Sequence, residues 1–183
     1  MSTQLFINAH IATGMPGSTA AETAAIQDIL VEDGKFISIA PHLKATLEAQ
    51  GKDMASVEVV DLGGKLVCPP FCDTHLHLDY VFTARKPGAV NESGTLFEGI
   101  QRWSETKADL TVDEIKERAK IGIAKEMRHG VQFIRSHADV TDPNLTSLKA
   151  LLELKEELKD TVTLQIVSFP QEGICLLYTS DAA

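Results

Sequence analysis

Two histidines separated by a single residue, His75 and His77, are the side chains of this sequence best suited to hold a metal ion. They follow an apolar run, residues 66–71, that is typical of a buried strand. Because residues i and i+2 of a strand point to the same face, the two imidazoles would lie side by side at the strand's end. Imidazole binds Zn, Fe and Ni, so the pair predicts two ligands of one divalent metal. A bare His-x-His pair is more often surface or core histidine; here the strand context favours the metal.

A second polar pair with the same spacing, His137 and Asp139, follows the strand-like run 131–134. Two interpretations stand: the pair lines a pocket or supports the metal histidines, or His137 is a hydrogen-bonded core histidine. Asp79 could orient a ligand histidine or cap the strand end. The same two interpretations apply to Asp73, which lies on the same side of the strand as the histidines. The other histidines are expected at the surface: His10, His42 and His129.

The elements that would position these groups alternate between strand and helix. Thr111 and Glu114 form a capping box, which predicts the start of a helix. Gly130 stands where a left-handed residue ends such a helix, and a strand is expected over 131–137. The predicted helix has one apolar stripe at i+4 spacing: Ile115, Ala119, Ile123 and Met127.

The following helix is predicted to begin at Asp142, as N-cap, with Pro143 in the first helical position, and to end near Asp160. A third strand is expected over 162–169. The order β-α-β-α-β, with crossovers of this length, predicts an α/β fold with parallel strands. The buried face of that helix is assigned to its leucines, beginning with Leu145, Leu148 and Leu152.

The sequence divides into three regions that differ in predicted secondary structure. Residues 1–66 are predicted to be β-rich, with a hairpin that turns at Gly34 and a short helix over 43–50. Residues 67–174 hold the α/β series, including a short helix over 96–106. Residues 175–183 continue no element and resemble the translation of a sequencing-library adapter, so they are predicted to be a non-native tail. An ordinary divergent C-terminus is the alternative.

Composition excludes several classes of partner. The chain has 17 Lys and Arg against 26 Asp and Glu, a formal net charge of −9, which argues against binding nucleic acid or an anionic membrane. No apolar stretch is long enough to span a bilayer, and no signal peptide is expected.

The three cysteines, Cys68, Cys72 and Cys175, form no disulfide framework or zinc pattern. Cys68 and Cys72 are expected to be buried strand thiols, and a cytoplasmic location is predicted.

A resemblance to a known family rests on three segments. Pro-Pro-Phe-Cys-Asp-Thr-His-Leu-His-Leu-Asp-Tyr (69–80) resembles the first barrel strand of the amidohydrolase superfamily. Gly-Thr-Leu-Phe-Glu-Gly (94–99) and Phe-Pro-Gln-Glu-Gly (169–173) resemble segments of bacterial cytosine deaminases. The resemblance covers nearly all of 1–174. It implies the first three βα units of a (β/α)8 TIM barrel, preceded by part of an N-terminal β-sandwich.

The same resemblance assigns roles to single residues. His75 and His77 would be ligands of a divalent metal, zinc or iron. Gln171 matches a glutamine whose amide, both donor and acceptor, reads the edge of a pyrimidine base. Leu96 matches a residue whose backbone contacts the base. The alternatives are a solvated turn for Gln171 and loop packing for Leu96.

The implied activity is metal-dependent hydrolytic deamination of cytosine to uracil and ammonia. The family's other metal ligands and its proton-shuttling glutamate come from later strands, so no catalytic acid or base is assigned within this chain. The chain by itself is therefore predicted neither to bind metal tightly nor to turn over substrate, whereas the full-length protein is expected to form a homo-oligomer. Two alternatives stay open: another cyclic amidine or amide substrate, such as isoguanine or creatinine, and a metal-free binding protein on a degraded barrel.

Overall fold

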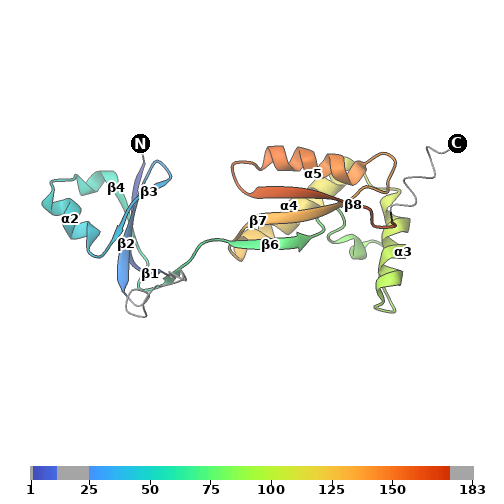
Figure 1. Cartoon of the computed structure of the whole chain (residues 1–183), viewed down its shortest axis with the longest axis horizontal. Coiled ribbons are helices and arrows are strands. Elements are labelled where there is room, and N and C mark those ends of the chain that lie inside the picture. Colours follow the sequence, from blue (N-terminus) through green and yellow to red (C-terminus); the bar gives the residue numbers. More distant parts are fainter. Residues whose placement is uncertain (1, 12–24, 174–183) are drawn as a thin grey trace. The chain divides into compact units, whose positions relative to one another are not determined.

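The computed structural model describes residues 2–11 and 25–173. The chain divides into two compact units, Met1–Pro69 and Pro70–Ala183, each of which has its own sheet (Figure 1). The predicted tail at 175–183 lies outside the described residues. None of the described helices is both long and apolar enough to cross a membrane.

The first unit is a mixed sheet; its short apolar runs predict the strands but not how they pair. Its strands are β1 (Thr3–Ile11), β2 (Ile26–Glu32), β3 (Lys35–Ala40), β4 (Val57–Asp61) and β5 (Leu66–Val67). They pair in the order β3-β2-β1-β4, with β5 also on β1; β1 runs antiparallel to β2 and parallel to β4 and β5. The described strands of this unit thus form one sheet, and no second layer of a sandwich occurs among them.

The turn and the small core of this unit follow from local sequence. Asp33 and Gly34 both have positive φ, 48° and 75°, which lets the β2–β3 hairpin close with two residues. The short helix α2 (Leu43–Ala49) and the 3-10 turn η1 (Met54–Ser56) connect β3 to β4. The core is a cluster of four buried side chains: Leu5, Leu30, Leu43 and Val57.

The second unit contains three parallel strands in the order in which they occur in the chain: β6 (Phe71–Leu76), β7 (Val131–Asp139) and β8 (Thr163–Phe169). Between them lie η2 (Thr83–Arg85), α3 (Leu96–Lys107), α4 (Val112–Arg128) and α5 (Thr146–Glu157). The β-α-β-α-β prediction is therefore confirmed for this unit. The three strands form an open sheet and not a closed barrel (Figure 1).

Helices α4 and α5 cover one face of this sheet. The predicted stripe of α4 is confirmed, since Ile115, Ala119 and Ile123 are buried and Met127 packs against them. On β7 the alternate residues Ile134, Ser136 and Ala138 are buried beneath the helices, which places His137 on the opposite face. The core that holds the strands in register therefore also decides which way the histidine points.

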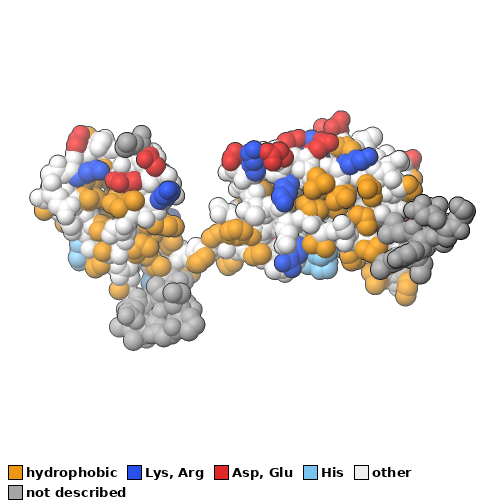
Figure 2. Space-filling view, turned by 45° about the horizontal axis from the view of Figure 1, so that its top comes forward, with side chains coloured by type: hydrophobic (Ala, Val, Ile, Leu, Met, Phe, Trp, Pro, Cys, Tyr) orange, Lys and Arg blue, Asp and Glu red, His pale blue; other side chains and the backbone are white. Residues whose placement is uncertain are grey.

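Ion pairs join the outer surfaces of the two helices. Lys116 of α4 lies 3.0 Å from a carboxylate oxygen of Glu153 and also pairs with Glu157, both on α5. Figure 2 shows acidic and basic side chains intermixed along one side of this unit. Surface pairs of this kind contribute little to stability, so the apolar core determines how α4 and α5 pack.

Three local predictions are wrong: the start of α5, the burial of two of its leucines, and the burial of two cysteines. Helix α5 begins at Thr146 rather than at Pro143, because the Asp142 carboxylate accepts the backbone N–H groups of Asn144 and Thr146 and forms a turn before the helix. Leu145 consequently takes a left-handed conformation and is 37 % exposed. Three further residues differ in burial from expectation: Leu152 is 50 % exposed, and Cys68 and Cys72 are both exposed.

The capping box of α4 gives a stability prediction. The Thr111 side chain accepts the backbone N–H of Glu114 at 3.2 Å and satisfies one of the free donors of the first turn. Thr111→Ala is expected to lower the free energy of unfolding by about 1 kcal/mol, measured by urea titration. Thr111→Ser retains the acceptor and is the control; equal losses in both variants would show that the hydroxyl contributes nothing.

Candidate functional site

Three histidines from two neighbouring strands meet at the carboxyl end of the second sheet. His75 lies near the end of β6, His77 just beyond it, and His137 near the end of β7, which runs parallel to β6. The Nε2 atoms of His75 and His77 are 3.3 Å apart. The His137 ring centroid lies 4.1 Å from that of His75 and 5.5 Å from that of His77. One ring nitrogen of each histidine lies within 4.8 Å of those of the other two.

This geometry fits a divalent metal. A tetrahedral ion with metal–nitrogen bonds of about 2.05 Å separates two ligand nitrogens by about 3.3 Å, which matches His75 and His77. The Nδ1 atoms of His77 and His137 are buried and have no hydrogen-bond partner among the described residues. A hydrogen-bonded core histidine would have one, so the structure favours a role for His137 at this site.

The electrostatics also favour ligation. Burial lowers the pKa of His77, and the neighbouring His137 and His75 lower it further. A lowered pKa keeps the imidazole neutral to more acidic pH, and the neutral ring is the form that binds a metal. Two aromatic rings enclose the cluster: Tyr80 stacks on His77 at 4.8 Å, and Phe169 meets the same ring edge-on at 5.2 Å.

A pocket of about 500 Å³ brings together the two residues predicted to bind substrate. Leu96 lies at the start of α3 and Gln171 in the turn after β8, and both line it. Leu96 is 73 % exposed, so its side chain is not simply packed into the loop. Tyr80 lines the same pocket and stacks on His77, so this ring connects the pocket to the histidine cluster.

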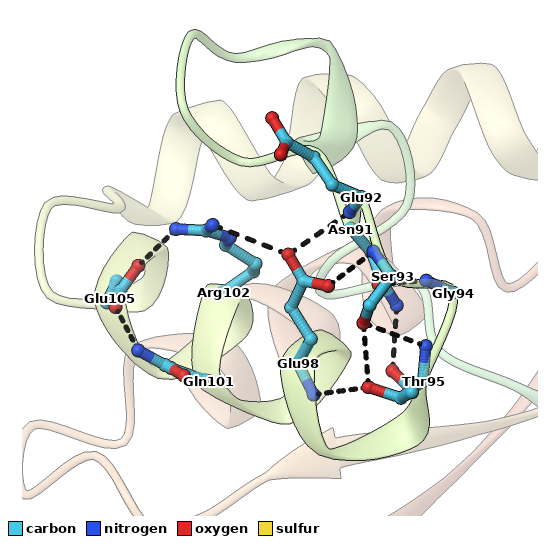
Figure 3. A network of polar contacts seen from close by, with 9 residues as sticks. All are labelled: Asn91, Glu92, Ser93, Gly94, Thr95, Glu98, Gln101, Arg102 and Glu105. Carbon is cyan, nitrogen blue, oxygen red and sulfur yellow. Dashed lines mark hydrogen bonds and ion pairs between the residues drawn. The ribbon is translucent and has the colours of Figure 1, made fainter.

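The loop before Leu96 is held by a carboxylate (Figure 3). Glu98 accepts the backbone N–H groups of Ser93 at 2.7 Å and of Glu92 at 3.1 Å, and Arg102 approaches it at 3.4 Å. The hydrogen bonds from Ser93 and Glu92 lower the pKa of Glu98 to about 2. This carboxylate therefore stays ionised, and both of its oxygens remain hydrogen-bond acceptors. Leu96 therefore begins α3 at the end of a loop with a fixed conformation.

The same loop is braced a second time. Asn91 donates from Nδ2 to the carbonyl of Thr95 at 2.9 Å and accepts the N–H of Gly94 at 2.8 Å. Thr95 caps α3 by accepting the N–H of Glu98 at 3.3 Å. The Thr-x-x-Glu spacing is a sequence signal for this helix start, although Glu98 bonds to Ser93 and Glu92 rather than to the N–H of Thr95.

The aspartates near the histidines hold backbone groups. Asp79, predicted either to orient a ligand histidine or to cap a strand end, accepts the N–H groups of Asp139 at 2.8 Å and Tyr80 at 3.1 Å. Burial, together with the negative charge of Asp139, raises the pKa of Asp79 to about 6, although the backbone hydrogen bonds that it accepts act in the opposite direction. Asp73 accepts the N–H of His75 at 2.9 Å. Both carboxylates thus fix the strand ends that carry the histidines.

Asp139 joins the strand ends to α3. Its carboxylate accepts Trp103 Nε1 at 2.7 Å and Lys107 Nζ at 3.1 Å. Burial alone would raise the pKa of Asp139, but hydrogen bonds from Thr141 and Trp103 and the charge of Lys107 outweigh it and lower the pKa. Asp139 is therefore an ionised buried group whose charge is matched by Lys107.

The other three histidines are those that the sequence predicts at the surface. His42 precedes α2 and His129 follows α4, and both are exposed. His10 is on β1, in the first unit. Of the six histidines in the sequence, the structure thus brings together His75, His77 and His137.

Comparison with known proteins agrees with this geometry. The profile of the amidohydrolase family matches residues 58–178. The 5-methylcytosine deaminase of Klebsiella pneumoniae, solved with 5-fluorocytosine, is 40% identical, with a TM-score of 0.76 over 93% of this chain and 37% of that one. The N-isopropylammelide isopropyl amidohydrolase of a Pseudomonas species is 30% identical over 88% of this chain and 39% of its own length.

A more distant relative is the pterin deaminase of Rhizobium rhizogenes, 28% identical over 78% of this chain and 31% of the relative. The chain thus spans less than two fifths of the length of each of these three proteins. The family profile matches well over half of the chain, across His75, His77, His137 and the pocket. This chain therefore belongs to the amidohydrolase family.

Proposed function

We propose that the full-length protein hydrolytically deaminates cytosine to uracil and ammonia. The observation that carries this proposal is the pocket in which Leu96 and Gln171, 75 positions apart, meet beside the histidine cluster. A largely apolar pocket whose lining includes the amides of Gln171 and Asn91 suits a small, flat heterocycle with donors and acceptors on its edge. The likeness to a solved 5-methylcytosine deaminase with a cytosine analogue supports the same substrate class.

The metal ion proposed for His75, His77 and His137 is zinc or iron, both of which imidazole binds. Such an ion would lower the pKa of a water molecule toward neutrality and supply hydroxide. His75 and His77 would hold the ion from one strand end, which Asp73 and Asp79 keep in place. The three parallel strands are proposed as the first three of an eight-stranded barrel, whose later strands supply the acid–base groups.

A second substrate class is favoured by one comparison. The Pseudomonas relative, 30% identical over 88% of this chain, is named for N-isopropylammelide and not for a pyrimidine. The Gln171 amide does not by itself separate cytosine from another ring with a similar edge. The substrate must therefore be decided by a panel that includes N-isopropylammelide, isoguanine and creatinine beside cytosine.

The role of Gln171 gives the test. Gln171→Ala in the full-length protein is expected to lower kcat/KM for cytosine about 30-fold, because an amide that makes two hydrogen bonds to the base is lost. The measurement is ammonia release across the panel. Gln101→Ala is the matched control, since Gln101 is an exposed glutamine of α3 whose amide donates to Glu105.

Each result has a defined meaning. Preference for cytosine in the unmodified protein, reduced in Gln171→Ala and kept in Gln101→Ala, supports the proposal. Release of amine from another ring with none from cytosine would reject the pyrimidine assignment and keep the family. No release from any of these compounds would leave the proposed activity without support.

A further inference from the structure

Lys107, the last residue of α3, joins three separate segments near the pocket. Its Nζ donates to Asp139 Oδ2 at 3.1 Å, to Thr141 Oγ1 at 2.6 Å and to Glu172 Oε1 at 2.6 Å. Asp139 ends β7, Thr141 follows it, and Glu172 lies in the turn after β8. A lysine ammonium has three N–H donors, so every one of them has an acceptor here.

The burial of this group makes the contacts energetically important. The Lys107 side chain is 12 % exposed, and those of Asp139 and Glu172 are 2 % and 20 % exposed. An ion pair shielded from water in this way is screened less than a surface pair. A hydrogen bond to a charged group is also stronger than a neutral one. The contacts therefore act as a clamp between α3, β7 and the turn.

The turn held by Lys107 carries Gln171. Residues 170–173 are closed by a bond from the N–H of Gly173 to the carbonyl of Pro170 at 2.9 Å. Glu172 is the next residue after Gln171, which lines the pocket. Because neighbouring residues in so short a turn cannot move independently, the contact at Glu172 restrains the backbone from which the Gln171 side chain extends.

Helix α3 links this clamp to the other side of the pocket. Its first residue is Leu96 and its last is Lys107, a span of about 18 Å at the rise of an α-helix. Between them, Trp103 donates to Asp139 Oδ2 at 2.7 Å, the same oxygen that Lys107 contacts. Figure 1 shows the described turn after β8, residues 170–173, next to α3, in agreement with the contact between Glu172 and Lys107. One rigid element thus fixes both predicted substrate contacts.

We propose that Lys107 is a positioning residue: its pairs with Glu172 and Asp139 hold the 170–173 turn against α3 and keep Gln171 in the pocket. The placement of the turn follows from the contacts alone. The consequence for substrate recognition rests on the proposed function, in which Gln171 binds the base. The test therefore has one readout that needs no substrate and one that does.

The first readout is backbone amide exchange, measured by mass spectrometry on peptides that cover 170–173 of the full-length protein. In Lys107→Met, exchange in this segment is expected to rise about tenfold, because the turn opens more often without the clamp. Glu172→Ala is the second variant, which releases the turn while leaving the Lys107–Asp139 pair in place. It guards against the possibility that Lys107→Met fails to fold, and the same rise is expected in it.

The second readout is steady-state kinetics with cytosine. A displaced Gln171 is expected to raise KM about tenfold and to change kcat less than about threefold, since the binding amide and not the metal site is disturbed. Lys107→Arg retains the charge and its donors and is expected to recover part of the KM. A purely structural loss would lower the amount of folded protein and leave the KM of the folded part unchanged.

Lys116→Met is the matched control. Lys116 is 14 % exposed and pairs with two carboxylates, Glu153 and Glu157, but it joins α4 to α5 and does not line the pocket. Both readouts are expected to stay unchanged in this variant. Unchanged exchange over 170–173 in both Lys107→Met and Glu172→Ala would overturn the clamp.

Faster exchange in an active enzyme with an unchanged KM for cytosine would overturn the role in substrate recognition. A full-length protein that is inactive on cytosine would instead reject the proposed function, and the exchange measurement would still decide whether Lys107 holds the turn. The two failures are therefore distinguishable.

Discussion

Replacement of His77 by alanine is expected to release the metal ion from the full-length protein and to lower kcat/KM roughly a thousandfold. His77 contacts both other members of the cluster: its Nε2 is 3.3 Å from that of His75, and its ring centroid is 5.5 Å from that of His137. A bound metal contributes several kcal/mol of charge stabilisation in hydrolysis, and about 4 kcal/mol corresponds to about a thousandfold in rate. Metal content by elemental analysis and steady-state kinetics measure the two effects.

His129→Ala is the matched control for this prediction. His129 is an exposed histidine after α4 and belongs to no histidine cluster. Metal content and rate are both expected to stay unchanged in it. If His77→Ala retained a full equivalent of metal together with the activity, the assignment of the cluster as the metal site would be wrong.

The largest expected effect on stability is that of Asp139→Ala. The change removes the acceptor of Trp103 Nε1 and of Lys107 Nζ, and it leaves two buried donors with fewer partners. Breaking a buried charge pair on one side is strongly destabilising, and because Lys107 keeps Glu172 and Thr141 we expect a loss of about 3 kcal/mol in the free energy of unfolding. Urea titration followed by circular dichroism measures it.

Two further variants serve as comparisons for Asp139→Ala. Asp139→Asn retains one carbonyl oxygen of the same shape and is expected to lose about half as much, since the neutral hydrogen bonds to it are weaker. Asp109→Ala, at an exposed position near the end of α3, is expected to change the free energy of unfolding by less than about 0.5 kcal/mol. A loss below about 1 kcal/mol in Asp139→Ala would contradict the role of this carboxylate as the link between β7 and α3.

The features that sequence predicts well here depend on neighbouring residues. The same-face placement of His75 and His77 follows from the period of a strand, and the start of α4 follows from the Thr111 cap. Each depends on backbone geometry over a few residues, so the pattern in the sequence is enough. The resemblance added Leu96 and Gln171, which no local pattern would have placed in one pocket.

The features that could not be predicted from the sequence depend on contacts between residues far apart in the chain. Whether His137 joins the metal histidines depends on the parallel pairing of β6 with β7, in which Leu76 lies opposite Ser136. The clamp made by Lys107 joins residues 32, 34 and 65 positions away. No periodicity in the sequence encodes such a network, because its members lie on different elements.

Local competition explains the error at α5. Asp142 followed by Pro143 is a common helix start, but the Asp142 carboxylate bonds to two later N–H groups and closes a separate turn. The helix then starts three residues later than Pro143. Leu148 packs against the core and the later Leu154 is buried, as predicted, whereas Leu145 and Leu152 are exposed and Leu151 is buried. The pattern thus identified the helix and part of its buried face.

The most direct test of the whole account is the formation of uracil and ammonia from cytosine by the full-length protein, measured as isolated, after a chelator has removed its metal, and after zinc or iron is restored. The account predicts about one metal ion per chain, loss of turnover on chelation and recovery on reloading, with none of these in His77→Ala. Turnover that persists in metal-free protein, or metal-loaded protein that releases no ammonia from cytosine, would contradict it.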